Sequence, residues 1–254
     1  LCGKDRMHPS TDGHLVMAYL FLKAQGLAGK LVADIRIDGA GKKVTRSDNC
    51  RVSDLSVSSD NLTFTYEAKS LPYPIDTSYY DNEKHTQADA LSVIPFMDEM
   101  NYEGLSVSGL SDGYYGLTIG GEFIGRFTAR ELERGINMAL LQNTPQYKQA
   151  MKIRQMNEER WLKERKMREF YWVEYNLMRK TGMLWACDEA AVDTLRKYRP
   201  HDIFLQWNGD LWLQYMHKGI REDCVNEQQD LVDRIYEQNK PIPLQIEIKK
   251  FTDL

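Results

Sequence analysis

The sequence has few of the residues and patterns that define several common classes of protein. Its four cysteines are widely spaced and form no Cys-x-x-Cys pair, which argues against a zinc site. The net charge of −4 lacks the basic excess of nucleic-acid-binding proteins, so no nucleic acid is expected as a partner. No apolar run is long enough to span a membrane, because the longest, residues 15–22, ends at Lys23. Internal repeats and low-complexity linkers are absent as well.

The overall composition is that of a folded globular protein. Hydrophobic residues make up 42% of the chain and aromatic residues 11%, which is enough apolar material to build a core rather than a disordered chain. A length of 254 residues suits one or two domains. The sequence around Leu1 has no signal-peptide pattern.

The four cysteines leave two alternatives open. In an exported protein, Cys2 could pair with Cys50 and Cys187 with Cys224. Four reduced and mostly buried thiols are an equally good interpretation.

One stretch at the start of the chain places an acid and an imidazole on a loop that leads into an apolar helix. Asp5 and His8 are three residues apart, so a turn can bring the carboxylate onto one ring nitrogen and leave the other facing outward. Such a pair is the orienting half of a nucleophile, base and acid constellation. Pro9 has a φ suited to a helix start, and polar residues 10–12 can accept hydrogen bonds from first-turn amides. Asp5 and His8 are therefore the candidate catalytic residues.

The whole N-terminal string resembles the last motif block of the SGNH (GDSL-type) hydrolase family. The matching features are Asp-x-x-His-Pro, a polar spacer, Gly-His, and a helix that begins Leu15-Val16-Met17-Ala18. In that family the Asp orients the His, and the His is the general base for a serine. The resemblance implies that Asp5 and His8 are two triad members. It also implies that residues 1–27 close an α/β, flavodoxin-like catalytic domain.

The remaining blocks of that family are missing from this chain. The family's nucleophilic Ser lies in a Gly-Asp-Ser block that precedes the Asp-x-x-His block, and the chain contains no Gly-Asp-Ser. We therefore expect this chain to be the C-terminal portion of a longer hydrolase. The remainder of the catalytic domain, on upstream sequence or a second chain, would supply the serine and the oxyanion hole.

The resemblance implies a serine hydrolase that cleaves O-acyl or acetyl esters linked to carbohydrate. It implies an extracytoplasmic bacterial enzyme, periplasmic or secreted, that needs no metal or organic cofactor. The expected partners are an ester substrate, such as an acylated carbohydrate, and the rest of the catalytic domain. The alternative is a non-catalytic carbohydrate- or protein-binding module in which the Asp-x-x-His is vestigial.

Residues 28–127 have the patterns of an accessory antiparallel β region with one inserted helix. Alternating apolar residues predict three successive strands of one small antiparallel sheet, over 30–38, 51–58 and 62–66. Residues 87–101 have a helical apolar face that Pro95 should kink or shorten. Short glycine turns predict three further consecutive antiparallel strands, over 105–110, 113–121 and 122–127. This second half loosely resembles the β region that follows the catalytic domain in some carbohydrate-linked SGNH hydrolases.

Residues 128–254 are predicted to be mainly helical, which makes the fold class α+β. Thr128 and Glu131 form a capping box at the start of this region. A stretch from residue 146 to about 180 has no Gly or Pro and predicts one very long helix, whose charges of both signs suit i,i+4 pairs on a solvated face. Shorter helices are predicted over 188–198 and 226–239. The alternation over 242–251 predicts a terminal strand added to a sheet edge.

Other polar and aromatic residues receive weaker assignments. His14 is interpreted as a capping or packing residue, and His85 and His201 receive no role because they have no neighbours at metal-ligand spacing. The string 206–212 contains Trp207 and Trp212 among amides. It could present flat rings and amides to a sugar, although core packing of both tryptophans is the favoured interpretation.

Overall fold

The computed structural model describes residues 1–2, 6–78 and 85–251, and its internal contacts divide the chain into two compact units. The first, here called the β unit, comprises Leu1–Lys152 and Asn239–Leu254. The second, here called the helical unit, comprises Ile153–Gln238. These units describe packing, and the division into domains at 1–27, 28–127 and 128–254 stays a prediction.

The β unit contains all of the strands found among the described residues, and together with the helices they confirm the predicted α+β class. Its elements in chain order are α1 (Thr11–Ala24), β1 (Ala33–Asp38), β2 (Lys43–Asp48), β3 (Cys50–Val57), β4 (Asn61–Ala68), the 3-10 helix η1 (Gln87–Ser92), α2 (Phe96–Glu99), β5 (Glu103–Ser108), β6 (Tyr114–Ile119), β7 (Glu122–Thr128), α3 (Ala129–Arg134), β8 (Ile136–Asn137), η2 (Met138–Leu140), the first turns of α4 (Pro145–Val173) and β9 (Leu244–Lys250). Residues 87–101 form two short helices on either side of Pro95, so the single helix predicted there is interrupted and not merely kinked or shortened.

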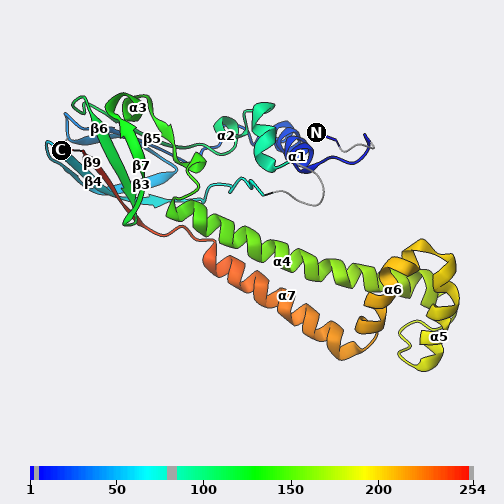
Figure 1. Ribbon diagram of the computed structural model, residues 1–254. Helices are drawn as coiled ribbons and strands as arrows, with labels where there is room; N and C mark the ends of the chain where they lie inside the picture. Colours follow the sequence, from blue (N-terminus) through cyan, green and yellow to red (C-terminus); the bar gives the residue numbers. More distant parts are fainter. Residues whose placement is uncertain (3–5, 79–84, 252–254) are drawn as a thin grey trace. The chain divides into compact units, whose positions relative to one another are not determined.

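The strands form two sheets rather than the consecutive antiparallel groups expected from the sequence. One sheet has the order β2-β1-β5-β8 and the other the order β3-β4-β9-β6-β7. The strands of the second sheet are labelled in Figure 1. The two predicted groups of three successive strands are therefore wrong, since each group is divided between the sheets. Strands β1 and β5 even pair in parallel, with Ile35 beside Leu105. The alternation that identifies each strand is local, whereas its partner is chosen by contacts far away in the sequence.

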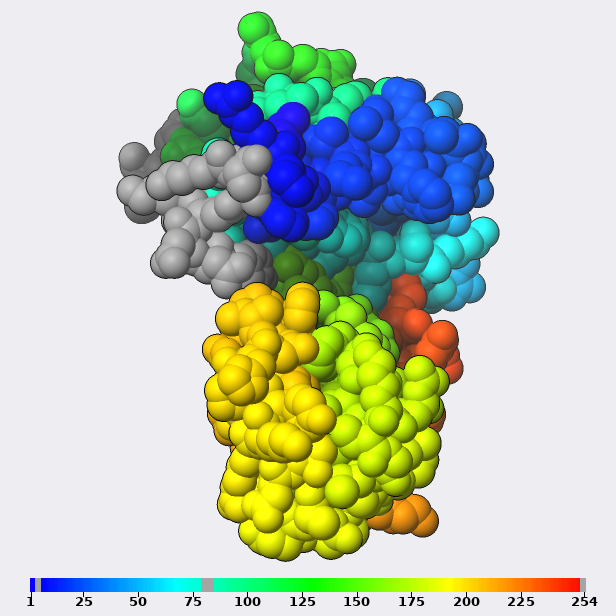
Figure 2. Space-filling model, turned by 90° about the vertical axis from the view of Figure 1, so that its right-hand side faces the viewer, coloured from blue at the N-terminus to red at the C-terminus, as the bar shows by residue number. Residues whose placement is uncertain are grey.

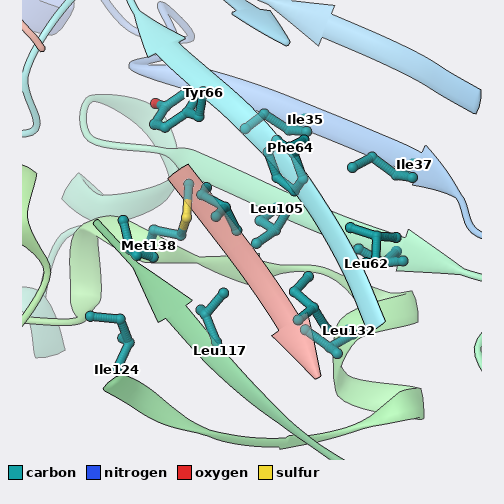
Figure 3. Packing of buried hydrophobic residues seen from close by; sticks show 14 of the residues in the cluster. Ile35, Ile37, Leu62, Phe64, Tyr66, Leu105, Leu117, Ile124, Leu132 and Met138 are labelled. Carbon is teal, nitrogen blue, oxygen red and sulfur yellow. The ribbon is translucent and has the colours of Figure 1, made fainter. Parts of the chain in front are cut away.

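The core of the β unit lies between the inner faces of the two sheets. Ile35, Leu105 and Val107 from the first sheet are fully buried, as are Phe64 and Ile246 from the second. The apolar side chains of both sheets point toward one another in the close-up view (Figure 3). The arrangement is a two-layer β structure, and the alternation of each strand places its apolar residues in the shared core.

The C-terminal strand β9 lies in the middle of its sheet, which corrects the expectation of an edge strand. It pairs antiparallel with β4 on one side and with β6 on the other (Figure 1). Leu244, Ile246 and Ile248 are all buried. Between β4 and β6, the backbone groups of β9 are paired on both sides. At an edge of the sheet, one row of these groups would be unpaired.

The first helix, α1, is buried on one side only, although the sequence suggests a buried helix. Leu15 and Tyr19 pack against residues of η1 and α2. Met17, Leu20 and Phe21 are exposed by 58%, 56% and 64%. The helix ends at Ala24, shortly before Gly26.

The helical unit is built on the long helix that the sequence predicts. Helix α4 runs to Val173 and continues as the π-helix η3 (Glu174–Met178). The unit also contains α5 (Glu189–Tyr198), the 3-10 helix η4 (Arg199–His201), α6 (Ile203–Tyr215) and α7 (Lys218–Gln238). Helix α7 begins eight residues before the start predicted at residue 226, so Asn226 lies in its interior. The yellow-green and yellow segments of this unit pack closely together in the space-filling view (Figure 2).

The charged face of α4 consists of ion pairs one helical turn apart, as predicted. The pairs are Arg154–Glu158, Glu164–Arg168 and Arg165–Glu169, with N···O distances of 2.8, 3.0 and 2.7 Å. Because these groups are at the surface, each pair contributes only a few tenths of a kcal/mol, roughly 0.3–0.5 kcal/mol. The capping box is confirmed too, since Thr128 Oγ1 accepts from the Glu131 amide at 3.2 Å and the Thr128 amide donates to Glu131 Oε2 at 2.7 Å.

All four cysteines are free thiols in this structure. Cys50 and Cys224 are buried, whereas Cys2 and Cys187 are exposed. Burial raises the pKa of the Cys50 thiol. Among the described residues, no helix has the length and apolar character needed to cross a membrane.

Candidate functional site

The loop that carries the two predicted catalytic residues is closed at its base. Cys2 and Pro9 form an antiparallel bridge, and the Ser10 amide donates to the Leu1 carbonyl at 3.1 Å. His8 is exposed on this loop, directly before the start of α1. Asp5 lies outside the described residues, so its predicted contact with His8 stays a prediction.

The first turn of α1 carries a buried acid, Asp12, behind this loop. Its side chain is 7% exposed and accepts hydrogen bonds from Ser10 Oγ and, at 2.7 Å, from the Gly13 amide. Burial alone would raise the pKa of Asp12, but these hydrogen bonds outweigh it and hold the pKa below its usual value. Asp12 is therefore a fixed negative charge at the helix start. Ser10 donates to Asp12 instead of capping the helix with its side chain, which differs from the predicted role.

The structure brings a second histidine to this acid. His85 Nδ1 lies 3.6 Å from Asp12 Oδ2, and the His85 side chain is 51% exposed. A carboxylate this close to Nδ1 of a half-exposed imidazole is the kind of neighbour that orients a general base, although 3.6 Å is longer than a hydrogen bond. The sequence gives His85 no role, because the two residues are far apart along the chain and no local spacing connects them.

Two further histidines are exposed in the structure. His14 is exposed on α1, so the packing role expected for it is wrong. His201 is exposed in the helical unit. The described part of the chain contains no group of three His, Cys, Asp or Glu side chains that could hold a metal ion.

A second functional candidate is a buried acid in the helical unit. Glu174 opens the π-helix and is 1% exposed. Its Oε1 accepts from Trp212 Nε1 at 2.7 Å, and its Oε2 accepts from the Trp185 amide at 2.9 Å. Both carboxylate oxygens are thus satisfied, and they join α6 and the loop before α5 to the end of α4. Irregular π turns often mark functional positions in helices.

Removing the indole donor should destabilise the helical unit. Replacing Trp212 with phenylalanine keeps a ring in the core but leaves Glu174 Oε1 without a partner. The expected cost is about 2 kcal/mol in the free energy of unfolding. Urea unfolding followed by tryptophan fluorescence measures it, because all five tryptophans lie between residues 161 and 212. Trp207→Phe, at an exposed position, is the control and should change stability by less than about 0.5 kcal/mol; equal losses would contradict the role of Glu174.

The two tryptophans of the string 206–212 have different environments. Trp212 is fully buried, as core packing requires, whereas Trp207 is 66% exposed. Tyr171, Tyr175 and Trp185 are further exposed aromatic residues of the helical unit, at 38%, 45% and 44%. No function was expected for these three residues from the sequence. The signal in the sequence was the position of Trp185, which follows the predicted end of the long helix at about residue 180 and is not needed to fill a helical core.

Comparison with known protein families gives a match for the helical unit. Residues 151–240 match the family model described as the diltiazem deacetylase C-terminal helical domain. That match covers the whole helical unit and its two boundaries with the β unit. No curated protein matches the chain.

One solved protein structure is similar to nearly the whole of this chain. It is BT4096, a gut microbial diltiazem-metabolizing enzyme, which is 41% identical to this chain with a TM-score of 0.92. The match covers 99% of this chain and 57% of that one. The chain therefore spans less than two thirds of the length of that enzyme.

These findings correct the resemblance to the SGNH family. The family model that matches is that of the diltiazem deacetylase helical domain, and no SGNH model matches. The resemblance depended on one short N-terminal string, and an Asp and a His three residues apart occur often by chance in polar loops. The expected flavodoxin-like end of an SGNH domain over 1–27 is not supported either, since α1 packs on η1 and α2.

Proposed function

We propose that this chain is part of an ester hydrolase that removes acyl groups, acetyl groups above all. The observation that carries the proposal is the 41% identity and the structural likeness, over 99% of this chain and 57% of the other, to a diltiazem-metabolizing enzyme. The match of the helical unit to a domain of a diltiazem deacetylase supports the same reaction. Diltiazem is the first ester to test, and acetylated carbohydrate is the second.

In the proposed mechanism, His8 acts as the general base and Asp5 orients it. His8 takes the proton from a serine hydroxyl as the serine oxygen forms a bond to the ester carbonyl carbon. The ester C–O bond breaks, and His8 returns the proton to the leaving alcohol. Water then releases the acid from the acyl-enzyme by the same steps.

Further parts of the site are proposed to lie outside this chain. Ester hydrolysis needs a nucleophile and hydrogen-bond donors for the oxyanion. More than two fifths of BT4096 has no counterpart in this chain, which leaves room for both. Export from the cytoplasm also remains a proposal, and it is compatible with either state of the cysteines.

The test is hydrolysis by the longest native form of the protein. It is incubated with diltiazem and, separately, with acetylated xylo-oligosaccharides, and free acetate and the deacetylated product are quantified. We expect acetate to be released from at least one of the two substrates. If the folded protein released no acetate from either and did not hydrolyse p-nitrophenyl acetate, the hydrolase proposal would be wrong. The alternative of a non-catalytic binding module would then be favoured.

A further inference from the structure

A hollow on the surface of the helical unit has the character of a binding site. It has a volume of about 510 Å³ and lies between α4, the loop before α5 and α7. Met167, Tyr171, Trp185 and Val225 form its apolar side. Its size is within the range of roughly 300–1,000 Å³ that is usual for small-molecule sites.

The aromatic floor of this hollow is held rigidly. Trp185 has a φ of 66°, a conformation that an aromatic residue rarely adopts. The buried Glu174 fixes its amide at 2.9 Å, and one face of the indole stacks on Phe170 at a centroid distance of 6.3 Å. Tyr171 and Tyr175 meet the same indole edge to face, both at 6.0 Å. Backbone strain that is maintained by so many contacts is a common feature of ligand sites.

The polar side of the hollow has two basic side chains and one acidic side chain, Lys218, Arg221 and Glu222. Lys218 Nζ pairs with Glu222 Oε1 at 3.0 Å. Arg221 Nη1 donates to the backbone carbonyls of Tyr215 and Met216 at 2.6 and 2.7 Å. The Asn226 side chain, with its amide donors and acceptor, also lines the hollow. A ligand here meets hydrogen-bonding groups rather than a strong net charge.

We propose that this hollow binds a short neutral oligosaccharide. A pyranose ring has an apolar C–H face that packs on a flat aromatic ring, and hydroxyl groups at its edge that hydrogen-bond to amide, ammonium and carboxylate groups. The ring stacks on the indole of Trp185, Tyr171 stands beside it at nearly a right angle to the indole, and the hydroxyls face Asn226 and the Lys218–Glu222 pair. A purely aromatic ligand fits less well, because such ligands bind where most of their surface is buried, and this floor is open to solvent.

This inference is independent of ester hydrolysis, so its test measures binding. Xylohexaose, cellohexaose and mannohexaose are titrated by calorimetry into the longest native form of the protein. At least one should bind with a Kd on the order of 1 mM or tighter. Tyr171→Ala and Asn226→Ala should each weaken binding about tenfold, which corresponds to ~1.4 kcal/mol. Trp185→Ala should abolish binding, provided that its circular dichroism spectrum shows a folded helical unit.

Trp207→Ala is the matched control, because it removes an equally large exposed ring that does not line the hollow. It should bind the sugar as tightly as the unmodified protein does. The inference is overturned if none of the three sugars binds, or if Tyr171→Ala and Asn226→Ala both bind as tightly as the unmodified protein. Equal weakening by Trp207→Ala would also overturn it. If the unmodified protein binds a sugar but releases no acetate from either ester, the result counts against the proposed hydrolase function and supports this inference.

Discussion

Replacing His8 with alanine in the longest native form should slow hydrolysis of p-nitrophenyl acetate by about 10²–10⁴-fold. The reason is that the serine hydroxyl is a weak nucleophile until a neighbouring base accepts its proton. His8 is exposed on a loop closed by the Cys2–Pro9 bridge, so its loss should not disturb the fold. The measurement is the ratio of kcat/KM values for the two proteins, with far-UV circular dichroism to show that both are folded.

Two further histidine variants show whether His8 or another histidine is the base. His14→Ala removes an exposed imidazole from α1, close by in the chain, and should leave the rate within about twofold of the original. His85→Ala tests the imidazole that lies 3.6 Å from Asp12. A large loss for His85→Ala with an unchanged rate for His8→Ala would transfer the role of base to His85. An unchanged rate for both would show that neither histidine is the base.

The second large effect concerns the stability of the β unit as a function of pH. Its free energy of unfolding should fall by about 3 kcal/mol as the pH rises from about 4.5 to above 7, and Glu103→Gln should remove this fall. Glu103 is fully buried on β5, and burial raises its pKa from 4.5 to about 7. Hydrogen bonds from Tyr66 Oη at 2.8 Å and Gln146 Nε2 at 3.3 Å offset only part of that rise.

The sign follows from the protons bound in each state. Between pH 4.5 and about 7, the native state keeps the proton on Glu103 and the unfolded state loses it. Since the native state binds more protons, stability decreases with rising pH in this interval and stays low above it. Acids with lowered pKa values, such as Asp12 and Glu131, act in the opposite direction, but only at more acidic pH.

The contacts around Glu103 explain why its neutral form is favoured. Among the described residues, Glu103 Oε2 and Gln146 Oε1 are both buried without a hydrogen-bond partner. Gln146 Nε2 already donates to Glu103 Oε1, so the amide and the carboxyl group are neighbours. A proton on Oε2 gives the carboxyl group a donor for the Gln146 oxygen. A glutamine at position 103 offers the same donor at every pH, which is why Glu103→Gln should be tolerated.

Urea unfolding at about pH 5 and about pH 8 tests this prediction. The β unit contains no tryptophan, so its unfolding is followed by far-UV circular dichroism rather than by fluorescence. Glu103→Gln should equal the original protein at the lower pH and exceed it by about 2–3 kcal/mol at the higher pH. Glu133→Gln, at an exposed position on α3, is the control and should follow the original protein. Equal pH dependence in Glu103→Gln would show that this carboxyl group does not titrate as proposed.

The sequence by itself determined the local features of the protein. The capping box of Thr128 and Glu131, the extent of α4 and its surface ion pairs all depend on residues within one or two helical turns. The alternation of Leu244, Ile246 and Ile248 likewise identified a strand and its buried face, because side chains alternate across any strand. The α+β class follows from these elements, and the sequence was enough to predict it.

Only the tertiary structure decided which elements meet. It placed β9 between β4 and β6, and it paired β1 in parallel with β5, because burial of an apolar face does not specify the neighbouring strand. It also brought His85 to Asp12 and the amide of Trp185 to Glu174. Each of these contacts joins residues that are separated in the sequence, and no spacing rule connects such residues. The same limit explains the SGNH resemblance, since a short string fixes the order of residues but not the fold that surrounds them.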